Sequence, residues 1–140
     1  MRNSKPILLV EDDAVDVMTV RRALKDLQVA SELIPARDGE EALAYLRDNR
    51  NAKPCVILLD LNMPKMNGTE FMKIVKADAS LRRIPVIVLT TSNSDQDISE
   101  SFELGAAGYM VKSVDHKKFI EIIKTIDLYW TLSRLPSNGD

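Results

Sequence analysis

The chain has 140 residues, 45% hydrophobic and 29% charged, with a formal net charge of −2 at pH 7. This length suits one domain, and the lack of a basic stripe argues against nucleic-acid binding. Because no apolar segment approaches membrane-spanning length and residues 1–6 are too short and polar for a signal peptide, we expect a cytoplasmic protein without membrane contact. The single cysteine, Cys55, lies in an apolar run and is expected to be a buried core residue.

Five short apolar runs are predicted to be strands. Each is unbroken and bounded by turn residues or polar groups, which is typical of strands buried on both faces of a parallel sheet. The predicted strands cover residues 7–10, 33–36, 55–59, 85–89 and 108–111. Pro35 indicates that the second of them lies at an edge of the sheet.

Helical spacing of apolar residues separates these runs. A helix is predicted at about 14–28, a second after the turn at 38–39, a third from Gly68, a fourth that stops near Gly105, and a fifth from Asp115. Strands that alternate with helices indicate a doubly wound α/β fold, in which right-handed crossovers give a three-layer sandwich. We expect one domain over residues 1–135 and a flexible tail at 136–140.

Polar residues stand at the carboxyl ends of the predicted strands. Glu11 and Asp12 follow the first strand, Asp60 the third, Thr90 the fourth and Lys112 the fifth. Ligands of open parallel sheets bind outside this edge, so we expect these groups to gather there. Neighbouring carboxylates need a cation or raised pKa values, and oxygen ligands beside a phosphoryl group suit Mg²⁺. The pattern predicts phosphoryl transfer onto Asp60, with Thr90 as a hydroxyl donor and Lys112 as a positive charge for the anion.

At this point the chain resembles a receiver domain of a bacterial two-component response regulator. The residues that carry the resemblance are Leu9-Val10-Glu11-Asp12-Asp13, Asp60 with Met63-Pro64 and Gly68, Thr90, and Lys112. The match covers about residues 5–132. It implies a single-domain protein with a chemotaxis-regulator-like, flavodoxin-like (βα)5 fold and the parallel sheet order 2-1-3-4-5.

The resemblance implies a phosphoacceptor and a metal site. Asp60 would accept the phosphoryl group. Glu11, Asp12, Asp60 and the backbone carbonyl of Asn62 would hold Mg²⁺ or Mn²⁺. Asn62 would also flank the route of an attacking water and tune hydrolysis.

It also implies a phosphoryl-binding and switch group. Thr90 and Lys112 would contact the phosphoryl oxygens, and Thr91 belongs to the same group. Tyr109 would turn inward as Thr90 moves toward the phosphate, although plain packing on an outer strand explains this aromatic residue equally well. Ser92 would tune hydrolysis together with Asn62.

As a stand-alone receiver, the protein would take its phosphoryl group from a sensor histidine kinase and signal through phosphorylation-dependent protein contacts. It would not be an enzyme, although it would assist its own phosphorylation and autodephosphorylation with Mg²⁺. The face formed by residues 95–130 would serve a homodimer or another partner. Segments 22–24, 38–43 and 89–92, and the pairs 129–130 and 135–136, are similar to stand-alone receivers paired with bacterial phytochrome kinases, so the kinase would be a bacteriophytochrome.

Two positions depart from the family pattern. Ser113 follows Lys112 where the family has a proline after a cis peptide bond, and a cis bond before another residue costs about 2.5–4 kcal/mol. We expect the Lys112–Ser113 bond to be cis because a short loop follows the strand; a trans bond, with a different lysine approach, is the alternative. Asn67 replaces a common Asp, and little loss is expected because Asn suits a turn.

Other classes of function are less well supported. An aspartyl-phosphate hydrolase usually has an acid where Asn62 stands, and a nucleotide or flavin module would need a phosphate-binding glycine motif that is absent. A further alternative is an unphosphorylated interaction module that kept only the fold, and Ser113, which stands where the family has a proline, keeps this interpretation open. Among single residues, Asp13 is expected to cap a helix and His116 to face solvent, while the pair 129–130 covers the core or forms an exposed patch.

Overall fold

The computed structural model describes residues 5–112 and 115–132, where five strands alternate with five helices as predicted. The elements are β1 (Ile7–Val10), α1 (Ala14–Asp26), β2 (Leu33–Ala36), α2 (Gly39–Arg47), β3 (Val56–Leu59), α3 (Gly68–Ala77), β4 (Val86–Thr90), α4 (Asp95–Glu103), β5 (Gly108–Val111) and α5 (His116–Leu132).

The strands form one parallel sheet in the order β2-β1-β3-β4-β5, which confirms the predicted doubly wound fold. Strand β1 lies between β2 and β3, and Val10 is in register with both Ala36 and Leu59. The residues that follow β1 and β3 therefore leave the sheet side by side. Pro35 lies in the edge strand β2, as expected.

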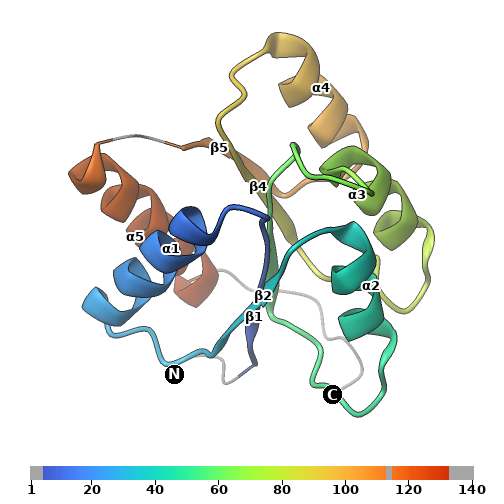
Figure 1. Ribbon diagram of the computed structural model, residues 1–140, viewed down its shortest axis with the longest axis horizontal. Coiled ribbons are helices and arrows are strands. Elements are labelled where there is room, and N and C mark those ends of the chain that lie inside the picture. Colours follow the sequence, from blue (N-terminus) through green and yellow to red (C-terminus); the bar gives the residue numbers. More distant parts are fainter. Residues whose placement is uncertain (1–4, 113–114, 133–140) are drawn as a thin grey trace.

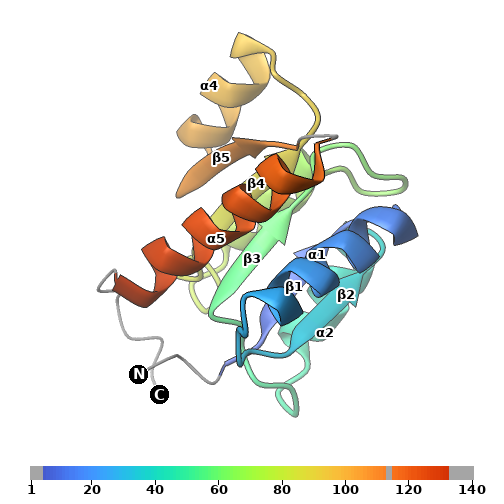
Figure 2. The same cartoon turned by 90° about the vertical axis from the view of Figure 1, so that its left-hand side faces the viewer.

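Helices cover both faces of the sheet. In Figure 1, α1 and α5 lie on one face and α2, α3 and α4 on the other, and Figure 2 shows the same layers after a quarter turn. Alternate residues of β1 serve the two cores: Leu8 and Val10 pack with α2 and α3, whereas Ile7 and Leu9 pack with α1 and α5. Cys55 is buried in the second core, as predicted.

Polar side chains cap the first turns of α1 and α3, the helices that follow β1 and β3 at the carboxyl edge of the sheet. Asp13 caps α1, as expected, because its Oδ1 accepts hydrogen bonds from the backbone N–H of Val15 and Asp16. Asn67 forms a capping box with Glu70 at the start of α3, with each side chain accepting from the other's backbone N–H. The asparagine thus suits the turn, as predicted.

Two local expectations differ from the structure. Strand β5 is only half-buried, because it is the second edge of the sheet, so Lys112 does not end a fully buried strand. Helix α1 stops at Asp26 rather than near residue 28, since Gln28 adopts a φ of 57° in the left-handed region, which cannot continue a helix.

Several sequence predictions fall outside the described residues. These concern the peptide bond before Ser113, the tail at 136–140, and the side chains of His116, Tyr129 and Trp130. Within the described ranges, no helix combines the length and apolar character needed to cross a bilayer.

Gly68 keeps α3 close to the backbone that follows β3. A Cβ atom at this position would lie 2.5 Å from the carbonyl oxygen of Asp60 and 2.7 Å from the Cα of Leu61. We expect Gly68→Ala to destabilise the protein by about 1–3 kcal/mol, because the close contacts outweigh the roughly 1 kcal/mol that alanine gains in a helix. Urea denaturation would measure the change.

Gly108→Ala is the matched control for this prediction. A Cβ atom there would meet only side-chain carbons of Ile87, at 3.7 and 3.8 Å. We expect its free energy of unfolding to stay the same or rise slightly, because alanine loses less chain entropy on folding. Equal losses in the two variants would contradict the steric argument.

Candidate functional site

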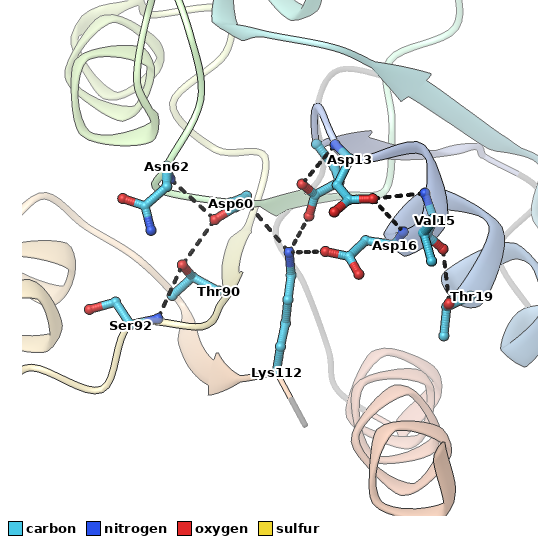
Figure 3. Close-up of polar contacts among 10 residues, drawn as sticks. Asp13, Val15, Asp16, Thr19, Asp60, Asn62, Thr90, Ser92 and Lys112 are labelled. Atoms are coloured by element: carbon cyan, nitrogen blue, oxygen red, sulfur yellow. Dashed lines mark hydrogen bonds and ion pairs between the residues drawn. The ribbon is translucent and has the colours of Figure 1, made fainter. Parts of the chain in front are cut away.

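Asp60 lies at the carboxyl end of the central part of the sheet, directly after β3, and is largely buried. Its backbone N–H donates to the carbonyl of Val10 at 3.0 Å, which ties it to the end of β1. Its Oδ1 accepts from the Thr90 hydroxyl at 2.9 Å and from the backbone N–H of Asn62 at 3.2 Å. Its Oδ2 lies 3.3 Å from Nζ of Lys112 (Figure 3). The carboxylate is therefore held by groups from three strand ends.

Lys112 brings the positive charge of the site. Its backbone N–H donates to the carbonyl of Thr90 at 2.7 Å, and its ammonium pairs with Glu11, with Asp16 at 2.8 Å, and with Asp60. Burial alone would lower the pKa of this lysine, but the hydrogen bonds to Asp16 and Glu11 outweigh it and raise the pKa above its usual value. The ammonium is therefore charged at neutral pH.

Glu11 is the most buried acid of the site, with a side chain that is 2% exposed. Burial raises its pKa from 4.5 to about 7, and the nearby charge of Asp60 acts in the same direction. The hydrogen bond from Lys112 acts in the opposite direction without cancelling the effect. A divalent cation beside Glu11 would relieve the repulsion between its carboxylate and that of Asp60.

Three carboxylates could hold such a cation. Glu11, Asp12 and Asp60 each offer one oxygen, and these oxygens all lie within 4.8 Å of one another. Oxygen-only ligands suit Mg²⁺ and similar hard ions, so the cluster is compatible with Mg²⁺ binding. Asp12 is exposed, which leaves one side of the cluster open to solvent.

Beyond the carboxylates, Ser92 connects several predicted switch residues. Its backbone N–H lies 3.5 Å from Oγ1 of Thr90, and its carbonyl accepts from the Tyr109 hydroxyl at 2.9 Å. Its own hydroxyl donates to Asp97, in the first turn of α4. Tyr109 is partly buried against the core formed with α2 and α3, and Thr91 is exposed.

Two acids that contact this site were not identified from the sequence. Asp16 lies in the first turn of α1 and pairs with Lys112, and Asp97 accepts from Ser92. Acids in the first turn of a helix are common because they complement the helix dipole, so neither residue stood out. The one available signal was that Asp16 lies a turn beyond Asp12.

Comparisons with known proteins show the family to which the chain belongs. A family model described as the response regulator receiver domain matches residues 7–124, and the chain belongs to this family of two-component phosphorelay receivers. Among its relatives, response regulator Rcp1 of Synechocystis sp. is 40% identical over 130 residues, which cover 90% of this chain and 88% of Rcp1.

Solved structures show the same likeness. The phosphorylated cyanobacterial phytochrome response regulator RcpA is 41% identical with a TM-score of 0.89, and the match covers 96% of this chain and 100% of that one. The Mn²⁺-bound form of Rcp1 is 39% identical with a TM-score of 0.87, covering 95% of this chain and 99% of the other. The family and the stand-alone phytochrome-type relatives are those that the sequence resemblance indicated.

The raised pKa of Glu11 gives a prediction for the metal-free protein. Since the folded state holds this proton more tightly than the unfolded state, stability from this group is present below about pH 4.5 and is lost as the pH rises to about 7. We expect Glu11→Gln, which cannot ionise, to gain stability relative to the wild type between pH 5 and 8, by on the order of 2 kcal/mol.

Urea denaturation in a chelating buffer at several pH values would measure this difference. Glu103→Gln, which neutralises an exposed acid at the end of α4, controls for the loss of one negative charge. A stability difference between Glu11→Gln and the wild type that does not change with pH would contradict the prediction.

Proposed function

We propose that Asp60 is the phosphoacceptor of this receiver and that it takes its phosphoryl group from a phosphohistidine of a sensor kinase. The observation that carries the proposal is the setting of the Asp60 carboxylate, between the Thr90 hydroxyl at 2.9 Å and the Lys112 ammonium at 3.3 Å. A hydroxyl and an ammonium on two sides of a carboxylate are the donors that a phosphoryl group on that carboxylate needs.

In the transfer, a carboxylate oxygen of Asp60 attacks the phosphorus atom and forms an acyl phosphate. The bond between phosphorus and the donor nitrogen breaks, its electron pair stays on the imidazole nitrogen, and that nitrogen takes up a proton. Lys112 and Thr90 hold the phosphoryl oxygens. Hydrolysis returns the carboxylate when a water attacks the phosphorus, on a route that Asn62 and Ser92 flank.

The proposal includes Mg²⁺, or Mn²⁺, held by Glu11, Asp12 and Asp60 and by the backbone carbonyl of Asn62. The oxygen cluster supports it, as does the Mn²⁺-bound form of the relative Rcp1. When bound, such an ion neutralises the phosphoryl oxygens that approach a site rich in negative charge. Lys112 alone would not balance the carboxylates and a phosphoryl dianion together.

Signalling is proposed to run through Thr90, Thr91, Lys112 and Tyr109. A phosphoryl group on Asp60 would draw Thr90 toward it and so disturb the hydrogen bond from Thr90 to Asp60. Such a disturbance reaches Ser92 and Tyr109, since their bonds meet in the same loop. The receiver thus acts as a switch, which assists its own phosphorylation and autodephosphorylation and is not an enzyme in its own right.

The proposed partner is a sensor histidine kinase in the cytoplasm, and a bacteriophytochrome is the kind that the phytochrome response regulators among the relatives favour. A second copy of the chain is proposed to bind the face formed by residues 95–130. The support is a groove between β5 and α5, where Met110 and Ile122 lie beside Lys118 and Glu121, and the exposed Phe102 of α4. Neither a nucleic acid nor a membrane is part of the proposal.

Phosphorylation tests the central proposal directly. We expect the wild type, incubated with acetyl phosphate and Mg²⁺, to gain one phosphoryl group, with acetate as the leaving group. Intact-mass spectrometry measures the adduct. Asp60→Asn should gain none, because its amide oxygen is a poor nucleophile.

Two controls make this experiment decisive. Chelation of Mg²⁺ should abolish the adduct on the wild type, and circular dichroism should show that Asp60→Asn remains folded. If the wild type gains no adduct from acetyl phosphate or from a purified sensor kinase, Asp60 is not the phosphoacceptor. The protein would then be an interaction module that kept only the fold.

Variants of two neighbouring acids, Asp12 and Asp13, distinguish the loss of a metal ligand from the loss of one negative charge near the site. We expect Asp12→Asn to weaken Mn²⁺ binding by about tenfold or more, because a carboxylate ligand is lost. Asp13→Asn makes the same charge change one residue away, and asparagine still caps α1, so its affinity should stay within about twofold of the wild type. Titration calorimetry with Mn²⁺ measures both, and equal losses would contradict the assignment of Asp12.

A further inference from the structure

Asp16 is an acid of the site to which neither the sequence analysis nor the proposed function gives a role. It occupies the third position of α1, after the cap formed by Asp13. Its Oδ2 lies 2.8 Å from Nζ of Lys112, although its side chain is 32% exposed while that of Lys112 is 7% exposed. A partly exposed residue on a helix therefore reaches into the site and contacts its buried cation.

Asp16 and Asp60 compete for the same ammonium, that of Lys112. An ammonium has three N–H donors, and those of Lys112 are taken by Glu11, Asp16 and Asp60. Of the two aspartates, Asp16 is the closer, at 2.8 Å against 3.3 Å for Asp60. Figure 3 shows these two aspartates on opposite sides of the lysine nitrogen. Attraction to Asp16 thus opposes any movement of the ammonium toward Asp60.

A phosphoryl group on Asp60 would compete for the same ammonium. No donor of Lys112 is spare, so a contact with a phosphoryl oxygen requires that one of its three present partners give way. Asp16 is the partner at the solvent side of the group, and its exposure makes it the one whose carboxylate water can satisfy most easily.

We infer that Asp16 is a positioning residue that holds the Lys112 ammonium back from Asp60 and so limits the affinity of the site for a phosphoryl group. The inference rests on the proposed function of Asp60. It gives α1 a part in setting the balance between the free and the phosphorylated receiver, through one side chain in its first turn.

Beryllofluoride in the presence of Mg²⁺ is the probe, because it imitates a phosphoryl group on a carboxylate. We expect Asp16→Asn to bind it about two- to fivefold more tightly than the wild type, which is the upper part of the range for a partly exposed ion pair. Titration calorimetry measures the affinity. An unchanged or weaker affinity would overturn the inference.

The matched control separates the lysine contact from the loss of charge. Asp13→Asn removes an acid from the same end of α1, and its carboxylate accepts from the backbone N–H of Val15 and Asp16 rather than from Lys112. This variant should bind beryllofluoride as the wild type does. A gain equal to that of Asp16→Asn would make the effect a general electrostatic one and overturn the inference.

A double-mutant cycle adds a second test. In a Lys112→Gln background, Asp16→Asn should no longer change beryllofluoride affinity, because its effect is exerted through the lysine. A gain that persists there would also overturn the inference. If the wild type itself does not bind beryllofluoride, the proposed function fails and the inference fails with it. If the wild type binds and only the variants behave otherwise than expected, the inference alone fails.

Discussion

The balance of charge around one buried ammonium is the constraint on which the whole site depends. Lys112 lies among the carboxylates of Glu11, Asp16 and Asp60 and forms an ion pair with each of them. Carboxylates this close are stable only beside positive charge or with a bound proton. Burial raises the pKa of Glu11, with a smaller contribution from the charge of Asp60, whereas the surrounding carboxylates raise the pKa of Lys112 against the effect of its own burial.

Parallel pairing imposes that crowding. Because β1 lies next to β3 with Val10 in register with Leu59, the chain cannot place Glu11 and Asp60 far apart. The hydrogen bond from the backbone N–H of Asp60 to the carbonyl of Val10 extends the pairing beyond the strands. Gly68 then allows α3 to start against the backbone of Asp60 and Leu61. The fold thus brings the negative charges together, and Lys112 from β5 compensates them.

The sequence predicted the parts of the site that depend on the backbone. Strand ends are visible as the points where apolar runs stop, and parallel strands gather their carboxyl ends at one edge, so Asp60, Thr90 and Lys112 could be grouped. The contacts of Asp16 and Asp97 depend instead on side-chain direction from helices, which periodicity does not give. Nor could a pattern show that the Tyr109 hydroxyl would donate to a backbone carbonyl 17 residues earlier in the chain.

The packing of the helices determines which of them can move when Thr90 moves toward a phosphoryl group on Asp60. Ser92 is bonded through its N–H to Thr90, through its carbonyl to Tyr109 and through its hydroxyl to Asp97, so movement of Thr90 must alter contacts to β5, to α4 or to both. Helix α3 resists displacement because Phe71, Met72 and Val75 are fully buried, whereas α4 buries only Ser101. Displacing α4 therefore sacrifices little apolar burial, and the stability of a segment is lowest where such burial is least. The hydrogen bond from Ser92 to Asp97 thus joins the carboxyl edge of the sheet to a helix that buries little apolar surface.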